Sequence, residues 1–173
     1  MNLASYIRDV PDFPKEGIVF KDITTLLQEP KAFQSAVDQM AAPFRGKGIS
    51  AVVGIESRGF IFGSAMSIAL ETSFVPVRKP GKLPAETVSE SYELEYGTDT
   101  IEIHQDAIEP GASVLMVDDL LATGGTMAAA VRLVKKLGGI VLGATFLIEL
   151  DFLKGRDQLP GVPVHSLIHC DSE

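Results

Sequence analysis

The chain has 173 residues, 46% of them hydrophobic, and a formal net charge of −8 at pH 7. This length predicts one domain, 1–173, and the acidic balance argues against nucleic-acid binding, which usually needs a basic surface. No apolar stretch reaches the roughly 20 residues that span a bilayer, and no signal peptide is recognisable. The single cysteine, Cys170, excludes an internal disulfide, so we expect a cytoplasmic protein.

The N-terminal region predicts loop-rich structure followed by one helix. Asn2 can cap a short helix that ends at Ile7, and the prolines and glycine of 10–17 indicate a loop. Segment 18–23 predicts an irregular stretch that covers the core. Pro30 suits the first turn of a longer helix. The apolar face of that helix comprises Phe33, Val37, Met40, Ala41 and Phe44.

A first strand–helix–strand unit occupies 51–77. The apolar run 51–55 predicts a buried strand, and the nearly all-apolar segment 60–70 predicts a buried helix. Segment 74–77 predicts the next strand, where Pro76 indicates either local irregularity or an edge position.

A second unit repeats this order. We expect a strand at 114–117, a helix from 127 to 137 that Gly138 stops, and strands at 140–148 and 164–168. Alternating units of this kind predict an α/β fold with a central, mostly parallel sheet flanked by helices. Ligands of such sheets bind beyond the carboxyl ends of the strands.

Between the two units lies a polar stretch, 80–90, and then two alternating runs, 92–96 and 101–103, joined at 97–99. The alternation predicts a β-hairpin. Such a hairpin is either a mobile lid beside the site or a plain surface excursion, and the pattern alone does not choose between them.

The segment VLMVDDLLATGGT, 114–126, is the most informative stretch of the chain. Its end places backbone N–H groups at a helix N-terminus, which carries about half a positive charge and binds phosphate. The glycines let an anion approach closely, whereas Asp118 and Asp119 suit hydroxyl groups or a metal. Together they predict a ribose 5-phosphate site. The alternative is an ordinary turn with a threonine cap.

Two common nucleotide loops are excluded, because no GxGxxG follows a strand and 81–83 lacks the rest of a P-loop. A metal cluster at His165, His169 and Cys170 is disfavoured, since no second ligand pair occurs at zinc spacing. A polyanionic ligand on an acidic chain needs local cations. The candidates are Arg58, Arg78, Lys79 and Lys82.

The strand, the aspartate pair and TGGT together resemble the phosphoribosyl diphosphate (PRPP) motif of the type I phosphoribosyltransferases. Five further stretches resemble the adenine-specific, bacterial-type branch of that family: FPKEGIVFKDIT at 13–24, ESRGFIFG at 56–63, VRKPGKLP at 77–84, YELEYGTD at 92–99 and ELDFLKGR at 149–156. The resemblance implies transfer of a phosphoribosyl group from PRPP to adenine, giving AMP and diphosphate. It also implies a hood (1–30 and 149–159), a hairpin lid (80–104) and a homodimer.

The resemblance assigns a role to each site residue. Mg²⁺ is expected as the cofactor, held mainly by substrate and water, and a cis peptide bond is expected at Glu56–Ser57. The sugar phosphate would contact Asp118, Asp119, Ala122, Thr123, Gly124, Gly125 and Thr126. Diphosphate would contact Glu56, Ser57, Arg58, Arg78, Lys79 and Lys82. Adenine would contact Val19, Phe20, Arg58 and Leu150, and the catalytic set would be Glu95, Tyr96 and Arg58.

Two other functions share the PRPP motif. A 6-oxopurine phosphoribosyltransferase, acting on hypoxanthine, guanine or xanthine, is the nearer alternative. A PRPP-sensing transcription regulator is the more distant one, because it would need an added DNA-binding module and a basic surface.

Overall fold

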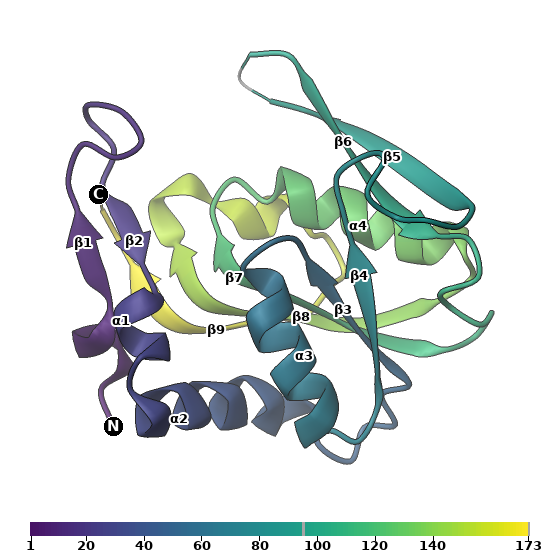
Figure 1. Cartoon of the computed structure of the whole chain (residues 1–173), viewed down its shortest axis with the longest axis horizontal. Helices are drawn as coiled ribbons and strands as arrows, with labels where there is room; N and C mark the ends of the chain where they lie inside the picture. The colour runs from purple at the N-terminus through teal and green to yellow at the C-terminus, as the bar shows by residue number, and fades with distance from the viewer. Residues whose placement is uncertain (95, 173) are drawn as a thin grey trace.

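Five parallel strands form the central sheet of the computed structural model, which describes residues 1–94 and 96–172 (Figure 1). The strand order is β4-β3-β7-β8-β9, and every neighbouring pair is parallel. This confirms the predicted α/β fold, and the terminal place of β4 confirms the edge position, one of the two alternatives that Pro76 indicated. The strands are β3 Ala51–Ile55, β4 Ser73–Val77, β7 Ser113–Leu121, β8 Ile140–Leu150 and β9 Val164–Cys170.

Helices cover both faces of this sheet, which explains the unbroken apolar runs of its central strands. Successive side chains of β7 point to opposite faces. Leu115 and Val117 pack in the core that contains α2 and α3, whereas Met116 packs in the core that contains α4. The helices are α1 Thr24–Leu27, α2 Pro30–Ala41, α3 Gly59–Ala69 and α4 Gly125–Lys136, and the 3₁₀ turns are η1 Leu3–Tyr6, η2 Ala42–Phe44, η3 Asp151–Leu153 and η4 Gly155–Gln158.

The helix boundaries follow local signals. Asn2 Oδ1 accepts a hydrogen bond from the N–H of Ala4 (3.2 Å), and Pro30 is the first residue of α2. Gly138, with φ of 86°, follows the last turn of α4. These observations confirm the predicted starts at Asn2 and Pro30 and the predicted stop at Gly138. Within the described part of the chain, no helix has both the length and the apolar composition that a membrane crossing requires.

Two antiparallel hairpins lie outside the sheet, one at each side of the molecule in Figure 1. The first pairs β1 Arg8–Val10 with β2 Phe20–Asp22, and the second pairs β5 Thr87–Glu93 with β6 Thr98–His104. The prediction of an irregular segment at 18–23 is therefore wrong at 20–22. The hairpin predicted at 92–103 is confirmed, but the loop predicted at 80–90 gives way to β5 at Thr87.

The first part of β5, 87–90, was not predicted as a strand because it is rich in polar side chains. Its partner strand buries Ile101 and Ile103, whereas β5 places Glu90 opposite Ile101. The Glu90 carboxylate binds Arg132 Nε (2.9 Å) and Lys136 Nζ (2.8 Å), both on α4. Ion pairs therefore hold part of this strand in place, and hydrophobic periodicity cannot detect them.

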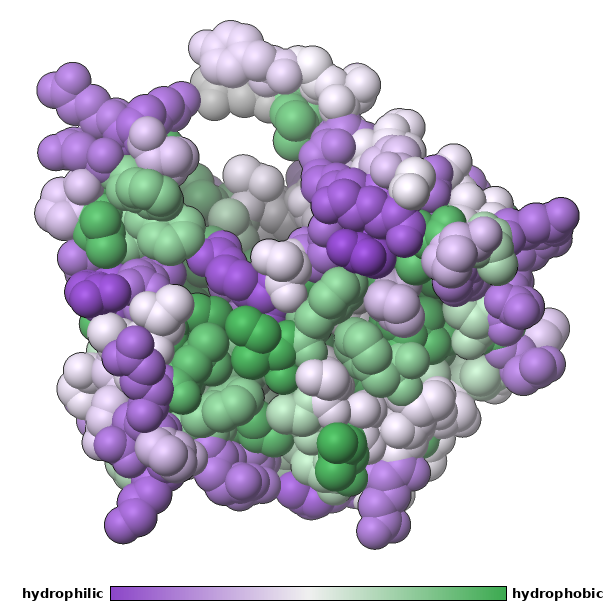
Figure 2. All heavy atoms as spheres, viewed as in Figure 1, coloured by the Kyte–Doolittle hydropathy of each residue, from purple (hydrophilic) through white to green (hydrophobic). Residues whose placement is uncertain are grey.

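Helix α3 is less buried than its apolar sequence predicts. Phe62 and Met66 are fully buried, but Ile68 is 79% exposed. Figure 2 shows hydrophobic side chains gathered on the face of the molecule that carries α3. The sheet and α2 cover the rest of the helix, so the predicted burial holds except at Ser64 and Ile68.

Glycines let α3 approach β3 closely. A Cβ atom on Gly63 would lie 2.8 Å from Phe74 Cε2, and a Cβ atom on Gly54 would lie equally close to the same ring atom. We predict that Gly63→Ala lowers the free energy of unfolding by about 1–3 kcal/mol, measured by urea denaturation. The loss should shrink when Phe74→Leu is present, because the ring no longer occupies the space. Equal losses in the two backgrounds would show that this contact is not the cause.

Candidate active site

Strand β7 carries two adjacent carboxylates at the carboxyl-terminal end of the sheet. It extends beyond the predicted range 114–117, because its pairing with β8 continues through Leu120 and Leu121. Asp118 and Asp119 therefore lie within a strand rather than in a loop. Asp119 is 4% exposed and Asp118 is partly buried, and the N–H of Asp119 donates to Oδ1 of Asp118 (2.9 Å).

The loop 122–126 turns β7 into α4 through a left-handed glycine. Gly124 has φ of 86° and is the N-cap residue, and no side chain caps α4 among the described residues. The alternative of an ordinary threonine-capped turn therefore fails. The first N–H groups of a helix have no partner within it, so this end of α4 offers free donors. The loop borders a hollow of about 90 Å³ beside Asp118 and Met127.

A larger cavity of about 340 Å³ adjoins this corner. It is lined by residues 56–58, by Lys79, by Tyr92 and Ile101 of the hairpin, and by the two aspartates. The structure thus gathers the loop after β3, the loop after β4 and the end of β7 around one space. This arrangement matches the expectation that ligands bind at the carboxyl ends of parallel strands.

The two aspartates occupy different electrostatic environments. Arg58 Nε lies 2.9 Å from Oδ2 of Asp119 and compensates that carboxylate. Burial raises the pKa of Asp118 well above its usual value, and the negative charge of Asp119 raises it further. The Asp119 N–H and the charge of Arg58 offset only part of this cost, and a carboxylate in such a place favours further hydroxyl donors or a cation. Mg²⁺ prefers such oxygen ligands, so the donor set fits the expected metal.

Arg58 also connects the aspartates to the first hairpin. Its guanidinium carbon lies 4.9 Å from the centre of the Phe20 ring, a cation–π distance. Val19 immediately precedes β2, and Leu150 ends β8, where it packs against the core. The structure therefore brings together Arg58 and Phe20 of the predicted adenine set. The contacts of Val19 and Leu150 with a base stay predictions.

Glu56 gathers the predicted diphosphate cations around itself. Its Oε2 binds Lys82 Nζ (2.9 Å), and its Oε1 accepts the backbone N–H of Lys79 (2.6 Å). Burial opposes the ionisation of Glu56, but Lys82 and the Lys79 amide outweigh that cost and lower its pKa. Arg78 Nε lies 3.4 Å from Oε1 and makes no hydrogen bond to any described residue. The Glu56–Ser57 peptide bond is cis, as expected.

Lys79 binds the second hairpin through its side chain. Its ammonium group contacts the Asp99 carboxylate and lies 5.9 Å from the centre of the Tyr92 ring. The Tyr92 hydroxyl also donates to Asp99 (3.2 Å). Tyr92 Cδ2 would lie 3.5 Å from a Cβ atom on Gly125, so the hairpin base covers the start of α4. The sequence analysis did not identify Tyr92 and Asp99 as site residues, although the alternation at 92–96 and 101–103 located the hairpin.

Of the two catalytic residues expected on the hairpin, the structure describes only Tyr96, which does not line the cavity. Tyr96 is 84% exposed. Glu95 lies outside the described residues. Of the expected catalytic set, Arg58 alone lines the cavity among the residues that the structure describes.

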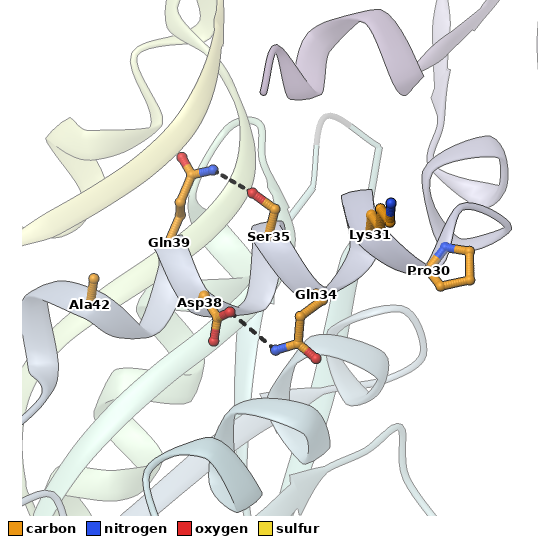
Figure 3. Close-up of a pocket in the computed structure, with 7 residues that line it drawn as sticks. All are labelled: Pro30, Lys31, Gln34, Ser35, Asp38, Gln39 and Ala42. Carbon is orange, nitrogen blue, oxygen red and sulfur yellow. Dashed lines mark hydrogen bonds between the residues drawn. The ribbon is translucent and has the colours of Figure 1, made fainter.

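A larger hollow, of about 540 Å³, lies along α2 (Figure 3). Its lining comes from one helix, and its polar side chains bond one another: Gln34 Nε2 donates to Asp38 Oδ2 (3.2 Å) and Gln39 Nε2 to Ser35 Oγ (2.9 Å). No second element contributes convergent groups there in the described ranges. The hollow therefore lacks the features of a binding site, despite its size.

The disfavoured histidine and cysteine cluster is absent from the described residues. His165 Nε2 lies 3.2 Å from the carbonyl oxygen of Gln39, whereas His169 Nδ1 lies 2.9 Å from Asp151 Oδ1. Glu149 joins His169 and Asp151 in an acidic group, but Arg156 already binds its carboxylate (2.6 Å). These side chains form ion pairs rather than an open ligand set.

Comparison with known proteins agrees with this geometry. The family model for the phosphoribosyl transferase domain matches residues 23–158. An adenine phosphoribosyltransferase of Acidobacterium capsulatum is 59% identical, over 96% of this chain and 92% of the relative. The crystal structure of adenine phosphoribosyltransferase from Rhodothermus marinus is 56% identical and superposes with a TM-score of 0.93, covering 97% of this chain and 96% of that one.

A third relative was solved with ligands. The adenine phosphoribosyltransferase of Saccharomyces cerevisiae, in complex with adenine and an imino-altritol bisphosphate, is 45% identical. Its TM-score is 0.90, and the match covers 95% of each chain.

The raised pKa of Asp118 predicts a cost in stability. Ionising this carboxyl destabilises the fold as pH rises from its usual pKa of 3.8 to the raised value. Asp118→Asn removes that cost and should raise the melting temperature at pH 7 by roughly 2–4 °C, the effect of about 1 kcal/mol in a chain of this size. The gain should fade as pH falls through 3.8 and be lost below about pH 3, where the carboxyl of wild type is mostly protonated in both states. Calorimetry at both pH values measures the difference in melting temperature between variant and wild type. A variant less stable than wild type at pH 7 would contradict a cost of ionising Asp118.

Proposed function

Because this chain belongs to the phosphoribosyl transferase family and, within it, to the adenine phosphoribosyltransferases, we propose how its residues carry out phosphoribosyl transfer to adenine. The enzyme transfers the 5-phosphoribosyl group of PRPP to adenine, giving AMP and diphosphate. One observation carries the assignment of roles: the end of β7 presents two carboxylates beside the free N–H groups of α4 in adjoining hollows.

The sugar phosphate binds across that corner. The 5-phosphate accepts hydrogen bonds from the N–H groups of 123–126, where the left-handed Gly124 leaves the backbone open to an anion. The 2- and 3-hydroxyls of the ribose donate to Asp118 and Asp119. The raised pKa of Asp118 supports this role, because hydroxyl donors stabilise a carboxylate that the free protein compensates only in part.

Diphosphate replaces the carboxylates of Glu56 and Asp99 as the partner of Lys82 and Lys79. Arg78 Nε, buried without a hydrogen bond to any described residue, is a donor ready for an anion. Lys82 leaves Glu56, and Lys79 leaves Asp99, as the diphosphate oxygens approach. Ser57 and Arg58 complete this side of the cavity. Exchange of partners keeps the cations paired at every stage, which a chain of net charge −8 favours.

When bound, Mg²⁺ would supply positive charge that neutralises the diphosphate leaving group. Asp118 and Asp119 are the protein groups that would hold it, through the ribose hydroxyls and water. The chain itself contributes three cations, Arg78, Lys79 and Lys82, which stabilise the negative charge on the same leaving group.

Adenine lies against Phe20, with Arg58 and the backbone of Val19 as hydrogen-bond partners and Leu150 on the opposite face. The contact of Arg58 with Phe20 and its ion pair with Asp119 support a position of the guanidinium between base and ribose. A 6-amino group donates where a 6-oxo group accepts. A site built for the donor leaves buried polar groups unpaired with the wrong base and can reject it by about 10⁴-fold.

The β5–β6 hairpin acts as a lid over the reacting bond. As the bond from the anomeric carbon to diphosphate breaks, water must be excluded, or PRPP would be hydrolysed. The base of the hairpin already covers the start of α4 through Tyr92. Glu95 and Tyr96 lie between β5 and β6 in the sequence, and Glu95 accepts the proton that adenine loses.

We also propose a cytoplasmic homodimer, as the resemblance implies. The single cysteine fits a reducing compartment. Among alternatives, a 6-oxopurine enzyme is disfavoured by the adenine-specific relatives, and a transcription regulator is disfavoured by the acidic net charge.

Purine specificity tests the proposed function directly. Incubation with PRPP, Mg²⁺ and one purine at a time should yield AMP from adenine, with hypoxanthine, guanine and xanthine used at least about 10⁴-fold less efficiently in kcat/KM. Chromatography of the products measures it. Formation of IMP or GMP at comparable efficiency would assign the protein to the 6-oxopurine enzymes instead.

The proton-transfer role of Glu95 has its own test. We predict that Glu95→Gln lowers kcat by about 10²–10⁴-fold, the usual contribution of a general acid or base. Glu93→Gln is the matched control, because Glu93 is an exposed glutamate on the same hairpin. A Glu95→Gln enzyme with the turnover of the control would remove this residue from the mechanism.

A further inference from the structure

A short turn between β8 and β9 packs directly against the phosphate loop 122–126. It is η4, Gly155–Gln158. A Cβ atom on Gly155 would overlap the carbonyl oxygen of Ala122 and lie 2.9 Å from Leu121 Cδ1. A Cβ atom on Gly124 would overlap the carbonyl oxygen of Gly155. The two backbones therefore meet at a pair of glycines, with no room for a side chain on either.

An ion pair holds this turn in place. Arg156, next to Gly155, binds both oxygens of Glu149: Nε to Oε1 at 2.6 Å and Nη2 to Oε2 at 2.8 Å. Its Nη1 also donates to the carbonyl oxygen of Val164 at the start of β9 (3.1 Å). A planar guanidinium that uses three donors on two strands has little freedom to move.

The anchor of this pair lies beside the phosphate loop. Glu149 is 3% exposed and stands opposite Leu121, the last residue of β7, in the β7–β8 register. These contacts form a continuous ring. Leu121 pairs with Glu149 across the sheet, and Glu149 binds Arg156. Gly155, the neighbour of Arg156, packs against Ala122, which follows Leu121 in the chain. Burial opposes the charge of Glu149, but Arg156 outweighs it and keeps the pKa of that carboxyl below its usual value. The pair therefore stays ionised at neutral pH.

We infer that Glu149 and Arg156 are positioning residues for the phosphate loop: by pressing Gly155 against Ala122 and Gly124, they aim the N–H groups of 123–126 at the 5-phosphate of PRPP. We name this pair, with Gly155, the Glu149–Arg156 brace. The inference rests on the proposed function, since it assigns the loop its phosphate. Neither side chain touches the substrate, so the brace acts through the backbone that it supports.

Glycine 155 gives the most direct test. In Gly155→Ala the new methyl group must push the loop away from η4, and a displacement near 1 Å can cost about 100-fold in a bound geometry. We expect the KM for PRPP to rise by about 10-fold to 100-fold, with the KM for adenine within about twofold of wild type. Gly139→Ala is the control, because its Cβ atom would lie 2.7 Å from Val134 Cγ1 at the opposite end of α4. It should lower stability without separating the two KM values.

Variants of the ion pair separate positioning from stability. Arg156→Gln leaves a buried carboxylate unpaired, so it should lower the melting temperature and raise the KM for PRPP. The double variant Glu149→Gln/Arg156→Gln removes the unpaired charge and should recover the melting temperature, but not the KM. Arg156→Lys should have a KM for PRPP between those of wild type and Arg156→Gln, because an ammonium group cannot bind both carboxylate oxygens in a fixed fork.

Arg45→Gln is the matched control for the arginine. Arg45 likewise joins a carboxylate, Asp38 (3.4 Å), to a backbone carbonyl, that of Ala69 (3.0 Å), at a place remote from the loop. Its KM for PRPP should stay at the wild-type value. If the KM for PRPP instead follows the melting temperature across all these variants, the pair is merely structural and the inference is overturned.

Calorimetric titration with ribose 5-phosphate separates this inference from the proposed function. The ligand reports on the phosphate loop without adenine and without turnover. We expect Gly155→Ala to bind it about 10-fold or more weakly than wild type. Equal affinities of the two proteins would overturn the brace alone. A wild-type protein that binds ribose 5-phosphate but forms no AMP would overturn the proposed function alone, and one that binds none would overturn both.

Discussion

The rest of the site depends on two adjacent carboxylates at the end of a buried strand. Asp118 and Asp119 lie in β7, and one arginine, Arg58, compensates Asp119 while stacking on Phe20 of the first hairpin. The other carboxylate faces the cavity with a raised pKa. Because free helix donors begin at Gly124, carboxylate acceptors and backbone N–H donors meet in adjoining hollows. Arg58 thus links the first hairpin to the end of β7.

Sequence patterns predicted this corner because its causes are local. An unbroken apolar run requires cover on both faces, so Val114–Val117 indicated a central strand of a parallel sheet. Gly124 adopts the left-handed conformation that suits glycine, and Pro30 and Gly138 mark helix ends by their own backbone constraints. The cis bond at Glu56–Ser57 was expected from family resemblance alone, because no pattern of residue types would indicate it.

Long-range pairing accounts for what the sequence did not predict. Strand β5 extends through polar residues because Glu90 binds Arg132 and Lys136, which are distant in the chain. Asp99 holds Lys79, and Arg156 holds Glu149, although each side chain by itself resembles an ordinary surface charge. The close approach of Gly155 to the phosphate loop depends on two backbones that meet only in the folded chain. The protein therefore pairs Lys79 and Lys82 with its own carboxylates, and the proposed function requires diphosphate to compete with them.

The location of a bound nucleotide tests the central claim most directly. We predict that a crystal structure with AMP shows its phosphate on the N–H groups of 123–126, its ribose hydroxyls within hydrogen-bond distance of Asp118 and Asp119, and its base against Phe20. Arg58 should keep its contact with Asp119. Nucleotide bound elsewhere, or a phosphate that contacts lysine side chains while the start of α4 stays unoccupied, would contradict the account.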